Sequence, residues 1–404
     1  MRKIIIILVA ALSGAVVMKA QDQKEKFNPV QTAVISQSIA PDARAGGMGD
    51  VGVATDPDVN SQAWNAAKYP FAISRGGIAL NYTPWLRQIV DDIDLAYLVG
   101  YARLGDYQAI SGSLRYFSLG DVYTNDGTDA VDGIPMTFKP YEWAFDVGYS
   151  RMLSEKFAAS VTFRYMYSDI SDHFDDGSEP GKAFAVDLGT FYNTYVNMGN
   201  RECQLSLGLN ISNLGSKINY GDDYSFFIPT NMRLGFNYMV PLNEYNRISF
   251  AADANKLLVP TYPTDAQCAK ALGYATDDGQ DHTAEYQTYR EEHFYNISPI
   301  SGIFKSFNDA PNGFKEELEE VQWSVGAEYT YNDKFTLRAG YHHESATKGN
   351  RKYFTVGAGF RMNVFQLDAG YVISTAVSNP LDQTLRVSLG FDLDGLRDLF
   401  NRGR

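Results

Sequence analysis

The stretch TLRVSLGFDL, residues 384–393, decides the fold. Every second residue in it is apolar, namely Leu385, Val387, Leu389, Phe391 and Leu393. The residues between them are charged, polar or without a side chain, namely Arg386, Ser388, Gly390 and Asp392. Because successive side chains of a β-strand point to opposite faces, this stretch predicts a strand that has an apolar environment on one face and a polar environment on the other.

The same alternation recurs along the chain in about fourteen segments of about ten residues. These segments are 76–84, 93–103, 107–117, 142–152, 157–168, 182–193, 203–212, 231–240, 246–255, 321–331, 335–344, 352–362, 365–374 and 384–393. Short links at 104–106, 154–156, 332–334 and 363–364 alternate with long polar connections at 118–141, 169–181, 213–230 and 256–320. An even number of such strands, with short turns at one end and long loops at the other, is typical of bacterial outer-membrane barrels. The sequence therefore predicts an all-β fold, an antiparallel transmembrane β-barrel of about fourteen strands over residues 76–393.

The two faces of these strands predict where lipid and lumen lie. The apolar faces carry tyrosines suited to a membrane interface: Tyr97, Tyr101, Tyr165, Tyr167, Tyr329, Tyr331 and Tyr371. The opposite faces carry charges of both signs, which we expect in the lumen: Arg115, Asp146, Arg164, Asp187, Arg233, Asp253, Glu328, Arg338 and Asp368. Glycines on the lumen faces are expected to leave room for bulky side chains of neighbouring strands: Gly100, Gly148, Gly208, Gly235, Gly326, Gly340 and Gly370. A soluble β-sandwich would alternate in the same way, but the even strand number, the loop asymmetry and the tyrosines favour the barrel.

The N-terminus indicates export. Residues 1–20 combine Arg2 and Lys3 with an apolar run from residue 4 to 18, which predicts a signal peptide cleaved after Ala20. An uncleaved anchor is the alternative, but the run is short for crossing a bilayer. The net charge of −13 disfavours a nucleic-acid partner because phosphates would repel the protein. The two cysteines, Cys203 and Cys268, are predicted to be unpaired.

Residues 21–75 do not alternate. They contain SIAPDARAGGMGDVGVATDPDVNSQAWNAAKYPF, residues 38–71, which is rich in glycine, alanine and aspartate and carries apolar anchors. An exported linker is the simplest interpretation, but the segment is too apolar to stay solvated. A barrel of about fourteen strands has a lumen wide enough to need a filler, so we expect residues 21–75 to form a hatch inside it.

This segment resembles a known hatch. APDARAGGMGDVGVA, followed by NSQAWNAAKY, is similar to the N-terminal hatch of FadL-type barrels and, within them, of the PorV (LptO) group of type IX secretion. The resemblance runs from about residue 31 to the last strand. The matching motif residues are Pro41, Asp42, Arg44, Gly46, Gly47, Met48, Gly49, Trp64 and Asn65. The chain departs from the family pattern at Ala66, where the family usually has proline.

The resemblance implies a function in protein secretion. Barrels of this group are not the secretion pore. They receive a secreted cargo protein by its C-terminal signal domain from a large outer-membrane translocon barrel, and they carry it to a sortase-like surface attachment complex. Membrane lipid and lipopolysaccharide are the other expected contacts. The peptidase is a separate protein, so the resemblance implies no catalytic residue, no cofactor and no metal in this chain. A FadL-like transporter of long-chain fatty acids or other hydrophobic solutes, and a protein linked to lipopolysaccharide deacylation, are the alternatives.

The connection 256–320 is the longest and mixes acidic with aromatic residues. Its candidate cargo- or partner-binding residues are Tyr262, Tyr274, Tyr286, Tyr289, Phe294 and Tyr295. A loop that merely shields the barrel mouth is the alternative. A short amphipathic helix is expected from Gly313, with Asn312 as its cap.

Three further features have weaker functional interpretations. Asp126, Asp129 and Asp132 carry oxygen ligands suited to calcium, but their spacing differs from an EF-hand, and a polar turn explains them better. His342 and His343 are adjacent on a strand and point to opposite faces, which disfavours a shared metal. Residues 394–404 are expected to form an amphipathic periplasmic tail.

Overall fold

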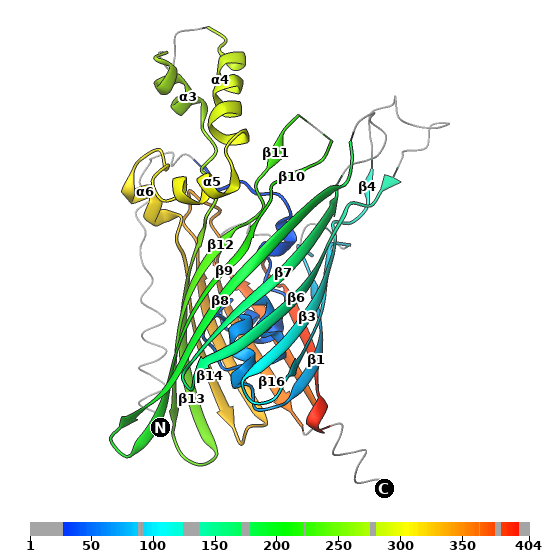
Figure 1. Cartoon of the computed structure of the whole chain (residues 1–404), viewed down its shortest axis with the longest axis vertical. Helices are drawn as coiled ribbons and strands as arrows, with labels where there is room; N and C mark the ends of the chain where they lie inside the picture. Colours follow the sequence, from blue (N-terminus) through cyan, green and yellow to red (C-terminus); the bar gives the residue numbers. More distant parts are fainter. Residues whose placement is uncertain are drawn as a thin grey trace.

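The computed structural model describes residues 27–87, 90, 92–123, 137–170, 178–221, 223–274, 280–362, 364–375 and 381–395. Fourteen strands in it form one closed antiparallel barrel (Figure 1). They are β1 (Gly76–Pro84), β2 (Asp94–Arg103), β3 (Gln108–Ser118), β6 (Tyr141–Ser154), β7 (Phe157–Asp169), β8 (Gly181–Met198), β9 (Arg201–Gly215), β12 (Asn231–Pro241), β13 (Asn246–Leu257), β14 (Gln322–Tyr331), β15 (Phe335–His343), β16 (Lys352–Arg361), β17 (Phe365–Ser374) and β18 (Leu385–Asp392). Each predicted strand corresponds to one of these, so the predicted fold class is confirmed.

Barrel closure joins the first strand to the last. Strand β1 pairs with β18, with Leu80 opposite Leu389 and Ile78 opposite Phe391. All remaining pairs in the barrel join strands that follow one another in the barrel order along the chain. Short links cluster at one end of the barrel, which we call the turn end. Long connections cluster at the other, which we call the loop end (Figure 1).

The long connections contain their own secondary structure. Two small hairpins are formed by β4 (Val122–Tyr123) with β5 (Thr137–Phe138), and by β10 (Ile218–Asn219) with β11 (Ser225–Phe226). The connection between β13 and β14 contains α3 (Asp265–Leu272), α4 (Thr283–Arg290), the π-helical turn η4 (Glu291–Tyr295), α5 (Pro299–Lys305) and α6 (Phe314–Glu319). Among the described helices, none is both long enough and apolar enough to cross a bilayer.

The outward faces of the strands are apolar and the inward faces are charged, as predicted. Leu80, Phe163 and Leu337 are between 54% and 63% exposed on the outside. Inside, Arg164 is buried and bridges Asp146 and Asp187, with N–O distances of 2.7 and 2.9 Å. A buried ion pair needs such complete partnering, because an unpaired charge in the lumen wall would lack hydration.

Strand β2 is an exception to the predicted faces. Its residues Leu95, Tyr97, Val99 and Tyr101 are buried inside the barrel, whereas Leu98 is 46% exposed outside. The prediction that Tyr97 and Tyr101 belong to a membrane-interface belt is therefore wrong. Both faces of β2 are apolar, because its inner face packs on the N-terminal segment rather than on water.

The N-terminal segment, residues 27–75, lies against the inner face of the barrel (Figure 1). It contains η1 (Ile35–Ser38), α2 (Ala43–Gly46), η2 (Val59–Ala63) and η3 (Ala66–Phe71). Tyr69 of η3 stacks on Tyr101 of β2, with ring centroids 4.5 Å apart. Ala63 and Val59 pack on Tyr97 and Val99, so the apolar inner face of β2 is covered by this segment.

The glycines of the lumen wall make room for this segment. A side chain at Gly326 would lie 2.6 Å from the Met48 carbonyl oxygen, and one at Gly208 would lie 2.5 Å from that of Val53. A side chain at Gly340 would lie closer still to the Met48 backbone. For Gly208, Gly326 and Gly340, the expectation that lumen glycines accommodate neighbouring strands is therefore corrected, since the atoms they admit belong to residues 48–53. Gly148 does lie against the neighbouring strands, at Ser111 and Thr162. Gly100 lies on the outer face of β2 with Leu98, so its predicted place in the lumen is wrong.

Candidate functional site

The N-terminal motif is held by an ion network across the barrel wall. The guanidinium of Arg44 pairs with Glu328 of β14 through two hydrogen bonds of 3.0 and 3.1 Å, and with Asp58 at 2.8 Å. Glu328 also accepts from Arg338 of β15 at 2.7 Å, and Arg338 reaches Asp368 of β17 at 2.6 Å. One arginine of the motif thus joins three elements of the wall.

Two aspartates that are not among the nine motif residues, Asp50 and Asp253, also attach the segment to the wall. Asp50 accepts hydrogen bonds from Arg386 of β18 and from the Tyr353 hydroxyl of β16. The carboxylate of Asp253 on β13 accepts from the backbone amides of Gly52 and Val53, at 2.8 and 3.1 Å. The charge alternation predicted Asp253 in the lumen, but it gave no information on its partner.

Asp42 and Asn65 shape the segment itself. Asp42 caps α2 by accepting from the Ala45 amide, and it also accepts from the indole of Trp64 at 2.6 Å. Asn65 caps η3 and donates to the Thr190 carbonyl of β8 at 2.8 Å. Because Asn65 provides this cap, the alanine at position 66 does not prevent the turn from forming.

The small residues of the motif allow close approach. Pro41, Gly46, Gly47, Met48 and Gly49 are all buried. A side chain at Gly47 would lie 3.0 Å from the Gly357 Cα, and one at Gly49 would lie 2.7 Å from the Tyr341 amide. Gly49 also has a φ of +74°, a conformation that favours glycine. The structure therefore buries all nine motif residues: Arg44, Gly47, Gly49 and Asn65 contact the wall, and Asp42 and Trp64 bond to each other within the segment.

The connection between β13 and β14 forms a helical projection at the loop end (Figure 1). We call residues 265–295, which include α3, α4 and η4, the upper helices. We call residues 299–319, which include α5 and α6, the rim helices. The upper helices rise farthest from the barrel, and the rim helices lie at its edge (Figure 1).

The six predicted binding aromatics separate into two groups. Tyr262, Phe294 and Tyr295 pack with Phe227 and Val259 in one cluster at the base of the upper helices. Phe294 is 3% exposed, so this group is mainly the core of the projection.

The second group is half-buried on the upper helices. Tyr274 stacks on His282 with ring centroids 3.9 Å apart, and Tyr286 lies 5.9 Å from His282. Tyr289 stacks on His293 at 4.0 Å. The structure therefore leaves Tyr274, Tyr286 and Tyr289 at positions where a partner can reach their rings.

Lys217 ties the projection to the neighbouring β10–β11 connection. Its ammonium donates to the carbonyls of Phe294 and Tyr295, at 3.3 and 2.8 Å, and lies 3.9 Å from the Phe227 ring centroid. Burial lowers the pKa of Lys217 to about 8, because no carboxylate offsets the loss of hydration. The base of the upper helices is consequently braced from two connections.

A second charged cluster holds the rim helices. Lys256 pairs with Glu317 and Glu320, at 3.0 and 2.5 Å. Lys348 pairs with Glu316 and Glu320, at 2.6 and 3.1 Å. All five side chains are buried, so α6 is fixed to the loop end of the barrel by its acidic face.

The helix expected from Gly313 is present, but its predicted cap is wrong. Gly313 itself is the N-cap, and the Asn312 side chain instead donates to Glu316 at 2.9 Å. Asp309 lies beside this helix, where burial together with Glu320 and Glu317 raises its pKa to about 6.

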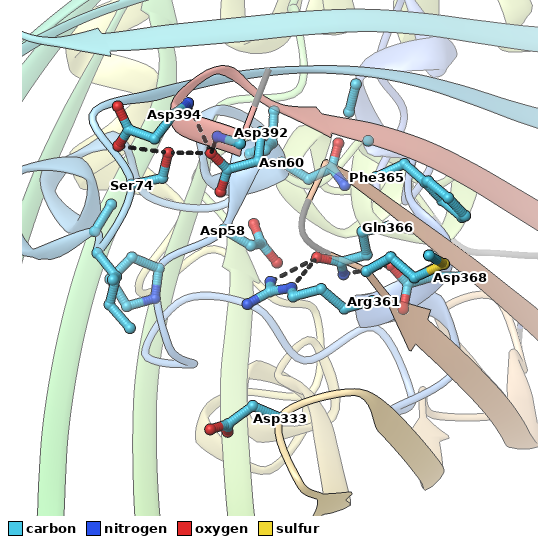
Figure 2. Close-up of a pocket in the computed structure, with 18 of the residues that line it drawn as sticks. Asp58, Asn60, Ser74, Asp333, Arg361, Phe365, Gln366, Asp368, Asp392 and Asp394 are labelled. Atoms are coloured by element: carbon cyan, nitrogen blue, oxygen red, sulfur yellow. Dashed lines mark hydrogen bonds between the residues drawn. The ribbon is translucent and has the colours of Figure 1, made fainter. Parts of the chain in front are cut away.

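A cavity of about 540 Å³ lies at the turn end, between the N-terminal segment, the turn before β15 and strands β1, β2 and β16–β18 (Figure 2). The polar residues Arg361, Gln366, Asp368 and Asp392 line it together with the apolar residues Val59, Ile73, Met362 and Phe365. Arg361 donates to Gln366, and Ser74 donates to Asp392 at 2.8 Å (Figure 2). Asp58 reaches it from the segment. The cavity wall therefore mixes charged and apolar side chains.

Several predictions fall outside the described residues. They are the signal peptide 1–20, the residues Asp126, Asp129 and Asp132, and the tail residues 396–404. Cys203 and Cys268 are both buried and free, as predicted.

The comparisons with solved structures concern other barrels, and no curated protein matches the chain. The toluene transporter TodX of Pseudomonas putida is 12% identical over 87% of this chain and 96% of its own, with a TM-score of 0.47. The toluene transporter TbuX of Ralstonia pickettii is 11% identical over 91% of this chain and 98% of its own, with a TM-score of 0.42. A FadL homologue of Pseudomonas aeruginosa is 11% identical over 91% and 99%, with a TM-score of 0.40. At this level of similarity, none of them indicates what the present chain binds.

The sequence comparison is more specific. The family described as "Type IX secretion system protein PorV" matches residues 20–264, which is more than half of the chain. The match includes the N-terminal motif and the strands from β1 to β13. Together with the closed barrel and its apolar outer surface, it shows that this chain is an outer-membrane β-barrel and belongs to the PorV family of type IX secretion system proteins.

Proposed function

We propose that this barrel binds the C-terminal signal domain of secreted proteins at its loop end, which faces the cell surface. It receives them from a large outer-membrane translocon barrel and carries them to a sortase-like attachment complex. The family match supports a function in type IX secretion. The observation that carries the binding step is the helical projection, a braced structure that holds half-buried tyrosines and acidic side chains away from the membrane.

The upper helices have the composition of a recognition surface. Residues 265–295 contain seven acidic residues against two basic ones, and their reachable tyrosines lie among these charges. Tyrosine gives a large contact area at low entropic cost, and acidic side chains attract a basic partner surface. We therefore expect association with cargo to weaken as salt concentration rises.

The N-terminal segment acts as a hatch in this proposal. Arg44, Asp50, Asn65 and the Gly52 amide attach it to strands on several sides of the lumen, which supports this part of the proposal. A barrel filled in this way carries a folded cargo on its surface rather than through its interior.

The test is recovery of partners from native outer membranes. The protein is extracted in mild detergent, and proteins that accompany it are identified by mass spectrometry. We expect secreted proteins that retain their C-terminal signal domains, together with a very large barrel. Recovery of the chain alone with bound fatty acid or lipopolysaccharide would refute the proposed function.

A charge-reversed variant locates the contact. Glu285→Lys with Glu292→Lys alters two exposed side chains of the upper helices. The matched control, Glu155→Lys with Glu202→Lys, makes the same charge change at exposed positions of the turn end. We expect the first pair to reduce cargo recovery at least about tenfold and the control to leave it unchanged. Equal recovery from both variants would exclude the upper helices as the binding surface.

A further inference from the structure

The rim helices expose large apolar side chains that the fold does not cover. On α5, Ile300 is 69% exposed and Phe304 is 75% exposed. On α6, Phe314 is 75% exposed and Leu318 is 58% exposed. Members of each pair are four residues apart, so they lie on the same helix face. Phe307, between the helices, is 47% exposed.

The opposite faces of both helices are anchored, so these apolar faces have a fixed direction. Gly302 of α5 is buried so closely against Phe227 that a side chain there would lie 2.8 Å from that ring. The acidic face of α6 is paired with Lys256 and Lys348. Neither helix can turn its apolar side chains inward without breaking these contacts.

The apolar face of α6 continues into the lipid-facing wall. Helix α6 ends at Glu319, and β14 begins at Gln322. The outward residues Trp323 and Val325 of β14 are 42% and 44% exposed. Trp323 lies in an aromatic group with Tyr341 and His343, at 5.4 and 4.9 Å. Exposed Leu318, Trp323 and Val325 therefore follow one another along the chain, from the rim helix into the outward face of β14.

The position of α6 agrees with this continuity. It projects sideways past the outline of the barrel wall, below the upper helices (Figure 1). A helix in that position lies over the membrane beside the barrel. An amphipathic helix at an interface buries its apolar face in the acyl boundary and keeps its charged face away from it.

Two lysines mark where the lipid headgroups would lie. Lys305 and Lys315 directly follow Phe304 and Phe314, and both are exposed. Lysine beside buried aromatic side chains at an interface places its ammonium at the level of lipid phosphates. The Lys305 ammonium also donates to the His293 carbonyl at 2.9 Å, which holds it near the base of the upper helices.

We propose that α5 and α6 form a lipid-binding ledge, in which Phe304, Phe314 and Leu318 enter the outer leaflet and Lys305 and Lys315 bind the phosphates of lipid A. Two features favour lipid over a protein partner on this face: the chain continues directly into the lipid-facing wall, and Lys305 and Lys315 each follow an exposed phenylalanine. This inference stands independently of cargo binding, which we assign to the upper helices.

The test uses the full-length protein in phosphatidylcholine vesicles with and without lipid A. A bimane label on Asn308→Cys reports contact with brominated acyl chains, and the same label on Asp281→Cys serves as the control on the upper helices. Both positions are exposed, and the native cysteines are buried. We expect strong quenching at 308 and none at 281. Equal, weak quenching at both positions would overturn the proposal.

The lysines are tested by lipid A retention after detergent washing. Lys305→Gln with Lys315→Gln should lose about fivefold in lipid A affinity per lysine. Lys156→Gln with Lys334→Gln, at exposed positions of the turn end, should lose none. Equal retention in both variants would remove the phosphate-binding assignment.

Phe304→Ser with Phe314→Ser separates this surface from cargo binding. We expect it to reduce quenching at the 308 label while cargo recovery stays unchanged. Loss of cargo with unchanged quenching would identify the ledge as a protein-docking surface and overturn the lipid assignment.

Discussion

Replacing Arg44 by methionine should loosen the N-terminal segment while the barrel remains folded. The change removes two hydrogen bonds to Glu328 and one to Asp58, and all three side chains are nearly inaccessible to solvent. Removing one partner of a buried ion pair costs about 3–5 kcal/mol. The lower value applies here, since Glu328 keeps Arg338 as a partner. A cost of about 3 kcal/mol raises the local opening of the segment roughly 150-fold.

Hydrogen exchange of the Gly52 and Val53 amides measures this opening. Both amides donate to Asp253, so they exchange when the segment leaves the wall. Arg247→Met is the matched control, because its ion pair with Asp333 is exposed and is expected to contribute less than about 1 kcal/mol. A change of less than about threefold at Gly52 and Val53 would refute the reasoning, because each tenfold corresponds to only about 1.4 kcal/mol. An equal acceleration of hydrogen exchange in strand β7 would also refute the reasoning, because it would indicate that the whole barrel unfolds.

Three other outcomes follow from the packing and charges. Gly340→Ala should weaken attachment of the segment by about 1–3 kcal/mol in the same exchange experiment, because the added methyl group meets the Met48 backbone. Gly390→Ala is the control and should leave the attachment unchanged, because the nearest atom to its methyl group would lie 3.8 Å away. Lys256→Met should accelerate exchange in α6 more than Lys270→Met on exposed α3 does, because only the former leaves Glu317 buried without a cation. Exchange in α6, corrected for its intrinsic pH dependence, should show tighter attachment at about pH 5 than at about pH 7.5, because the raised pKa of Asp309 means that the attached state binds the proton more tightly. Asp309→Asn should remove that difference, and an unchanged pH dependence in this variant would contradict the assignment.

The barrel was predictable because the period of two is maintained in every strand. Each outward residue meets the same apolar surroundings, so local sequence carries the signal. Strand β2 shows the limit of that signal. Tyr97 and Tyr101 have the periodicity expected of lipid-facing residues, but their actual neighbours are Val59, Ala63 and Tyr69 of a segment that does not alternate. Which apolar face meets lipid is therefore a tertiary question, and periodicity cannot answer it.

The projection between β13 and β14 was only partly predictable. Its helix starts carry readable signals, such as the capping box between Thr264 and Gln267 and the Ser298 cap before Pro299. The burial of Phe294 was not readable, because it depends on Phe227 in a different connection. The exposed pairs of the rim helices were visible in the sequence as apolar residues four apart. Only the structure shows that those pairs point outward, because the acidic face of α6 and Gly302 of α5 are buried on the opposite sides.

The fit between Met48 and the wall glycines has a consequence for the order of folding. Arg44, Asp50 and Asn65 reach strands from β8 to β18, which lie far apart in the chain. The seam between β1 and β18 joins the first barrel strand to the last, so it can form only after β18 has been made. Residues 27–75 directly precede β1, and their backbone at Met48 and Val53 lies against wall glycines of β9, β14 and β15. We therefore expect insertion of the segment and closure of the wall to be coupled, so that the segment provides part of the surface on which the later strands pack.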